Sequence, residues 1–192
     1  MRLWRTILAL TVLTAGFSVG TLSASQFVLF PKASELISPN GHYAVRNVDA
    51  AGSASDFVGT FHSLWLFELP TGRFRKLCDY VGVASVAWSN NDFLIVTRYS
   101  KKTSQAMVFS ATGSADPVML DKPTLTYLVP VELRPPLRGN DHVFVESSRV
   151  EDDTLFLTVW GYGPHDPNGF RYRCEYSLAD GSITCTVERG SH

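Results

Sequence analysis

The chain has 192 residues, of which 45% are hydrophobic, 12% aromatic and 18% charged, and its formal net charge is −1. This composition excludes an intrinsically disordered chain, because disorder goes with few apolar residues and a high net charge. The absence of a basic stripe argues against duplex nucleic acid as a partner. A chain of this length is expected to fold as one domain with its own core.

The first 25 residues read as a secretory signal peptide. Arg2 and Arg5 form a short basic region before an apolar run at 7–19, and small residues at 23–25 offer a cleavage site. An uncleaved anchor helix is the alternative, because the apolar stretch could just span a thin bilayer. The protein is therefore expected in the periplasm or outside the cell, touching a membrane only if this segment is retained.

The stretch from residue 38 to residue 88 carries the clearest strand and turn signals. Ser-Pro-Asn-Gly at 38–41 suits a turn, because proline fixes φ and asparagine and glycine tolerate positive φ. Residues 64–69 form an apolar and aromatic run of strand length. Pro-Thr-Gly at 70–72 ends that strand, and residues 73–77 then alternate between polar and apolar side chains, as a half-exposed strand does.

The same order of turn and strands recurs twice further along the chain. Asn40, Asn91 and Asn140 lie in predicted turns at a period of about 50 residues, which is typical of a β-propeller blade of four strands. The inner strands of the second and third units are expected at 83–88 and 125–133. The remaining strands of these units are expected at 93–97, 105–109, 117–120, 142–145, 154–160, 170–177 and 182–187.

The pattern Ser-Pro-Asn-Gly, Leu-Trp-Leu-Phe-Glu-Leu, Thr-Gly and a basic strand ending in leucine resembles the WD40-like repeat of TolB-type β-propellers. Residues 38–88 match one such repeat well, and at 89–92 Ser-Asn-Asn-Asp stands where the family has Ser-Pro-Asp-Gly. The Gly-His and Trp-Asp signatures of true WD40 repeats are missing. The resemblance implies a fold and a habit of binding partners, and it implies no reaction.

The resulting prediction is an all-β domain, residues 26–192, made of three four-stranded propeller-like units. Their bounds are expected at about 33–80, 81–122 and 123–189. Closed propellers have four to eight blades, so three units would leave sheet edges open. The domain is therefore expected to be an incomplete or strongly bent propeller, unless two chains share one ring as a homodimer.

The cysteines fit an oxidising compartment. Cys174 and Cys185 lie on either side of a predicted turn, Ala-Asp-Gly at 179–181, so a disulfide across a hairpin is predicted. Two buried thiols are the alternative. Cys78 is expected to be a buried thiol at the end of a strand.

One loop stands out as a candidate binding site. Residues 161–169 combine three glycines and two prolines with polar and aromatic side chains. Tyr162, His165, Asp166 and Asn168 are the candidate binding residues, because loops carry function on rigid scaffolds. An ordinary glycine- and proline-rich connector is the alternative.

Motifs for catalysis, metals and cofactors are missing from the sequence. The histidines show no metal-ligand spacing, and no phosphate-binding or dinucleotide-binding fingerprint occurs, so neither a metal nor a cofactor is expected. The strand aromatics are expected to pack in the core: Trp65, Phe67, Trp88, Phe93, Phe109 and Trp160.

These observations favour a non-catalytic secreted or periplasmic recognition protein. It would bind another protein through loops on one face, for example as an inhibitor or immunity protein. One alternative is a structural envelope protein, and another is a secreted hydrolase whose site is assembled from loop residues. The hydrolase should show a pocket where titratable groups converge, drawn from His42, Asp56, His62, His142, His165 and Asp166.

Overall fold

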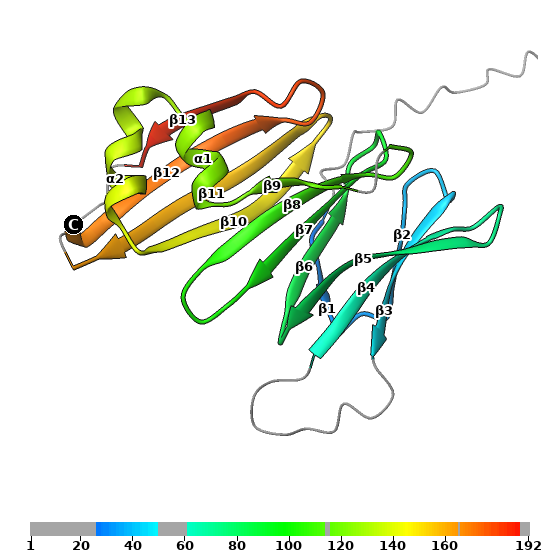
Figure 1. The fold of residues 1–192 in the computed structure, drawn as a ribbon. Coiled ribbons are helices and arrows are strands. Elements are labelled where there is room, and N and C mark those ends of the chain that lie inside the picture. The colour runs from blue at the N-terminus through cyan, green and yellow to red at the C-terminus, as the bar shows by residue number, and fades with distance from the viewer. Residues whose placement is uncertain (1–25, 50–60, 114–115, 165, 189–192) are drawn as a thin grey trace, which may run out of the picture.

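The computed structural model describes residues 26–49, 61–113, 116–164 and 166–188, so the predicted signal peptide lies outside the described residues. Three antiparallel sheets dominate the described part, and they lie side by side along the molecule (Figure 1). The sequence predicts an all-β domain, and the structure is mostly β, with short helices between the second and third sheets. In these residues no helix has the length and apolar character that a membrane span requires.

The first sheet is an antiparallel meander in the order β2-β3-β4-β5. The turns that the structure describes in this sheet, between β2 and β3 and between β4 and β5, are those that the sequence predicts. Asn40 orders the first one, because its side-chain oxygen accepts from the Ser38 hydroxyl and from the His42 backbone N–H, and Gly41 adopts a positive φ of 72°. The strands are β2 (Glu35–Ile37), β3 (Tyr43–Asp49), β4 (Phe61–Glu68) and β5 (Arg73–Val81).

The second sheet has five strands in the order β1-β6-β7-β8-β9, which corrects the prediction of three equal units. The extra strand comes from the start of the described chain, where Phe30 pairs with Ala84 and is itself fully buried. Its partner strand is distant in the sequence, so no local pattern indicates this pairing. The strands are β1 (Val28–Phe30), β6 (Ala84–Trp88), β7 (Phe93–Tyr99), β8 (Ser104–Ser110) and β9 (Val118–Leu120).

Helices follow the second sheet, so the strand predicted at 125–133 is wrong. Asp121 caps the first helix by accepting from the Thr124 backbone N–H, and a proline in the first turn preorganises φ. Two prolines likewise occupy the first turn of α2. The helices are α1 (Lys122–Leu128), the 3₁₀ helix η1 (Val131–Leu133) and α2 (Arg134–Gly139).

The third sheet is a second four-stranded meander, in the order β10-β11-β12-β13. Its first turn lies at 152–153, where Asp152 has a positive φ of 49°. The turn predicted at 138–141 is therefore not the counterpart of those at Asn40 and Asn91, because the helices shift the third meander along the chain. The strands are β10 (His142–Glu151), β11 (Thr154–Gly163), β12 (Asp166–Ser177) and β13 (Ile183–Val187).

The corresponding turns of successive sheets are linked by side-chain hydrogen bonds. The Asn40 amide donates to both carboxylate oxygens of Asp92, at 2.8 and 2.6 Å. The Asn91 amide donates to Asp153 at 2.6 Å. Each bond joins the first turn of one meander to the first turn of the next, so the same end of all three sheets is held in line.

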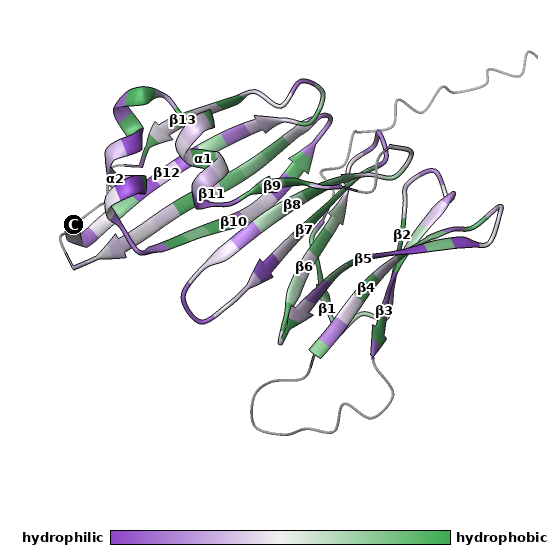
Figure 2. Ribbon diagram, viewed as in Figure 1, coloured by the Kyte–Doolittle hydropathy of each residue, from purple (hydrophilic) through white to green (hydrophobic). Residues whose placement is uncertain are grey.

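Both faces of the second sheet are buried, and its strands carry apolar side chains on both sides. Val96 and Phe109 pack with residues of the first sheet, whereas Ile95 and Val108 pack with the third sheet and the helices. Near-continuous apolar strands are expected where a sheet is covered on both faces. Figure 2 shows the hydrophobic residues along these strands and the hydrophilic hairpin between β7 and β8.

The predicted burial of the strand aromatics holds only in part. Trp88 and Phe109 are buried in the core between the first and second sheets. Trp65, Phe67 and Trp160 belong to neither buried core cluster and are only partly buried. The reason is strand alternation: residues 65 and 67 point opposite to the buried leucines at 64 and 66.

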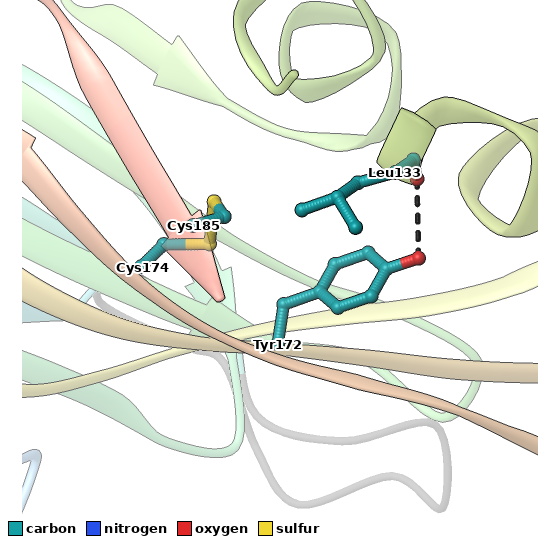
Figure 3. The surroundings of a disulfide bond; sticks show 4 residues. All are labelled: Leu133, Tyr172, Cys174 and Cys185. Atoms are coloured by element: carbon teal, nitrogen blue, oxygen red, sulfur yellow. Dashed lines mark hydrogen bonds between the residues drawn. A yellow bond between two sulfur atoms is a disulfide. The ribbon is translucent and has the colours of Figure 1, made fainter. Parts of the chain in front are cut away.

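The predicted disulfide between Cys174 and Cys185 is present and joins directly opposite residues of β12 and β13. Tyr172, two residues earlier on β12, donates its hydroxyl to the Leu133 carbonyl at 3.1 Å (Figure 3). On this face of the third sheet, the disulfide therefore links the edge strand β13 to β12, and the Tyr172 hydrogen bond links β12 to the helices.

Replacing both disulfide cysteines by serine is expected to lower the free energy of unfolding by about 3 kcal/mol, because the bond closes a short loop in the unfolded chain. Urea denaturation followed by circular dichroism measures the change. In the folded protein, burial raises the pKa of the remaining Cys78 thiol to about 11 and keeps it protonated. An unchanged midpoint and slope would contradict the expectation.

Candidate binding surface

The third sheet has two faces of different character. On the inner face, Val145, Leu157 and Val159 are buried against the second sheet and the helices. The residues that alternate with them point the other way. We call this second side the third-sheet outer face, and its side chains are His142, Phe144, Glu146, Arg149, Phe156, Thr158, Trp160, Tyr162, Arg171, Arg173, Glu175, Thr184 and Thr186.

Four rings form a ladder on this face, across β10 and β11. Register places His142 opposite Tyr162 and Phe144 opposite Trp160. The ring centroids of the first pair are 4.9 Å apart, and those of the second pair are 4.1 Å apart and nearly parallel. Tyr162 also stacks on Phe144 and Trp160, at 6.2 and 6.3 Å. We call His142, Phe144, Trp160 and Tyr162 the aromatic ladder.

One ring of the ladder is held by a hydrogen bond, and another is exposed to solvent. The Trp160 indole N–H donates to the Glu146 carboxylate at 3.0 Å, which fixes the ring. Tyr162 leaves 43% of its surface exposed. A large ring with few rotatable bonds, held in place before binding, loses little entropy when it contacts a partner.

Paired charges flank the ladder on β12. Arg171 lies opposite Trp160 in register, and its guanidinium contacts the Glu188 carboxylate at 2.9 Å. The Arg173 guanidinium bonds the other oxygen of Glu188 at 2.5 Å. These contacts lower the pKa of Glu188, Arg173 contributing most, so the carboxylate stays ionised at neutral pH. The exposed guanidinium edges remain available to a partner.

A cavity of about 430 Å³ lies on the same face, and its lining includes Thr158 on β11 but none of the four ladder residues. The Arg149 guanidinium lies 3.9 Å over the Phe156 ring at its wall. Arg173 and Glu175 contribute charges of both signs, and threonine hydroxyls supply neutral hydrogen-bonding groups. The face therefore combines flat aromatic surface, guanidinium groups and a hollow, an arrangement suited to holding a ligand by stacking and hydrogen bonds.

The residues predicted as a binding loop belong to a hairpin instead. Residues up to Gly163 end β11 and those from Asp166 begin β12, so the predicted loop is reduced to its tip. Tyr162 joins the aromatic ladder, and Asn168 lies exposed on β12. Asp166 pairs with Gly163 through the backbone, and His165 lies outside the described residues.

The sequence analysis missed His142, Phe144 and Trp160 as companions of Tyr162. Their signal is present, because aromatic residues alternate with valine and leucine along both strands. Alternation separates two faces but does not tell which one is covered.

Among the side chains that the structure describes, the titratable residues named for a hydrolase do not converge. His62 contacts the Asp49 carboxylate at 2.5 Å in the first sheet, whereas His142 lies in the third. Asp56 lies outside the described residues. Among the residues that the structure describes, no three His, Cys, Asp or Glu side chains group as a metal site would need.

A second cavity, of about 650 Å³, lies where the first sheet meets the hairpin of β7 and β8. Its lining pairs Asp79 with Arg98, whose guanidinium donates to the Asp79 carbonyl at 2.7 Å. The hydroxyl of Ser104, also in the lining, donates to the Val145 carbonyl at 2.8 Å. Both groups are thus engaged in holding neighbouring strands together.

Comparison with protein-family models, curated proteins and solved structures gives no match for this chain. The class of protein therefore follows from the molecule alone: a mostly-β chain of three antiparallel sheets with an aromatic, arginine-flanked face on the third.

Proposed function

We propose that this chain is a non-catalytic binding protein of the periplasm or extracellular space, and that it holds a protein partner on the third-sheet outer face. The observation that carries the proposal is the aromatic ladder with its exposed Tyr162 beside two arginines. Tryptophan, tyrosine and arginine dominate the binding energy of protein interfaces, and lysine is depleted there. The four strands that form this face contain no lysine.

The proposed periplasmic or extracellular location is supported by the sequence of residues 1–25 and by the disulfide, because disulfides persist in oxidising compartments. The proposal also takes the three sheets as propeller-like units of an incomplete, bent propeller. The support is the shared meander order and the asparagine–aspartate bonds between successive turns. An envelope inhibitor or immunity protein is the specific form that fits a small binding scaffold of this kind.

Tyr162→Ala is expected to weaken partner binding by at least about tenfold, because it removes the most exposed ring of the aromatic ladder. The full-length gene is expressed, and the protein recovered from the cell envelope captures its partner, which mass spectrometry identifies. Titration calorimetry then compares wild type and variant. Tyr162→Phe keeps the ring and is expected to retain most of the affinity.

The matched control is Tyr127→Ala, which removes a tyrosine that is 77% exposed, more than the 43% of Tyr162, from α1 on the other side of the third sheet. It is expected to bind as wild type does. Equal binding by Tyr162→Ala and wild type would overturn the proposed surface. Equal losses from both alanine variants would also overturn it, since the contact would then not be centred on the ladder.

A further inference from the structure

The first sheet also has an outer face, which is separate from the surface proposed above. Opposite residues on its strands form two rows across the sheet, read from the strand register in the order β2, β3, β4, β5. We call this side the first-sheet outer face; one row is Ile37, Ala44, Phe67 and Phe74, and the other is Glu35, Arg46, Trp65 and Lys76.

Aromatic rings gather on this face, and its most exposed apolar side chains stand on the edge strands β2 and β5. Phe74 lies 5.8 Å from Trp65 and 5.6 Å from Phe67 between ring centroids. Phe74 leaves 63% of its surface exposed, and Ile37 leaves 52%. The Arg46 guanidinium lies 4.6 Å over the Phe67 ring. An apolar patch rimmed by charges marks an interaction surface.

The charges on this face are balanced. Arg46 contacts Glu35 at 2.6 Å, and Lys76 contacts Asp79 at 2.7 Å. The face therefore presents both signs, with its acid at the β2 edge and a base at the β5 edge. Because neither sign of charge predominates, two copies of this face would not repel each other electrostatically.

The order of residues across the sheet makes the face complementary to itself. A two-fold axis parallel to the strands lays β2 of one copy over β5 of the other. Glu35 then faces the partner's Lys76, and Arg46 faces the partner's Trp65. In the other row, Ile37 faces the partner's Phe74, so an aliphatic side chain meets each exposed ring.

We propose that the first-sheet outer face is the interface of a two-fold symmetric homodimer. Two-fold dimers are the commonest oligomers, and their interfaces use the same patch on both subunits, as this pairing does. Sheets that pack face to face keep their strands within about 30° of parallel, which brings corresponding rows together.

The area of the face is adequate for such a dimer. Strands about 4.8 Å apart that rise about 3.3 Å per residue give a face of about 400 Å² in plan on each copy. Side chains project from this plane, so their accessible area is larger than the plan area. It approaches the roughly 600 Å² per partner at which stable interfaces begin. The expected dimer is therefore a reversible one, whose mass depends on protein concentration.

Charge reversal tests the pairing through sedimentation equilibrium. Glu35→Lys places two lysines opposite each other at both ends of the interface, and Lys76→Glu places two carboxylates there. Each variant alone is expected to dimerise at least about tenfold more weakly than wild type. An equimolar mixture of the two variants restores both opposite-charge contacts, so it is expected to form heterodimers at nearly wild-type strength.

Restoration in the mixture cannot come from a misfolded variant, because it requires two intact faces. Tyr162→Ala serves as the control and is expected to dimerise as wild type does, which separates this interface from the proposed partner surface. A wild-type chain that stays monomeric at the highest soluble concentration would overturn the proposal. So would single variants that dimerise normally, or a mixture that stays monomeric.

Discussion

Alanine in place of Phe109 is expected to lower the free energy of unfolding by about 3–5 kcal/mol. Phe109 is 1% exposed and lies on β8, where it packs with residues of the first sheet. The second sheet is held between two others, so its neighbours cannot collapse into the space that the ring leaves. Urea denaturation followed by tryptophan fluorescence measures the loss.

Phe61→Ala is the matched control, because it removes the same ring from a position that is 59% exposed on β4. Its expected loss is below about 1 kcal/mol, since surface substitutions leave no cavity. The contrast tests the central feature of the fold, the burial of the second sheet on both faces. Equal losses in the two variants would mean that the first and second sheets do not pack closely.

The features that the sequence predicts well are local ones. The turn at 38–41 and the tight turn at 70–72 follow from proline, asparagine and glycine, whose φ preferences need no tertiary context. The disulfide between Cys174 and Cys185 follows from a hairpin turn of known place. Each rests on a few adjacent residues, so neighbouring sheets could not change the outcome.

The helices at 122–139 could have been predicted, and the reason for the error is instructive. Leucine, valine and tyrosine at 125–133 are common in strands, and the repeat of about 50 residues predicts a strand at this position. Asp121 followed by a proline is a helix-start signal that outweighs this composition. Because the period was carried over from the first two units, Asn140 was assigned to a turn that lies instead at Asp152.

The site was predictable only in part. Tyr162 was found because glycines and prolines surround it. Its companion Trp160 is expected in the core from the sequence, because a large aromatic ring in a strand is usually buried, and Phe144 carries no separate prediction. Which face of the third sheet is covered depends on the helices and on the second sheet, which are distant in sequence. The ladder is therefore a product of tertiary packing.

Gly169→Ala is expected to lower the free energy of unfolding by about 3 kcal/mol or more and to weaken partner binding. Gly169 has a φ of +69°, which costs an alanine about 1–2 kcal/mol. An added Cβ would also overlap the Gly161 carbonyl oxygen and would lie 3.4 Å from the Cβ of Tyr162. The hairpin must therefore open at the point where it presents the aromatic ladder.

Gly72→Ala isolates the backbone contribution, because Gly72 has a φ of +70° and no heavy atom within 4 Å of an added Cβ. It is expected to cost about 1–2 kcal/mol, the conformational penalty alone. The difference between the two variants, measured by urea denaturation, is then the cost of separating β11 from β12 at Gly161. If both variants lose the same stability, the close approach of Gly169 to Gly161 does not hold in solution, and the ladder is not fixed by this hairpin.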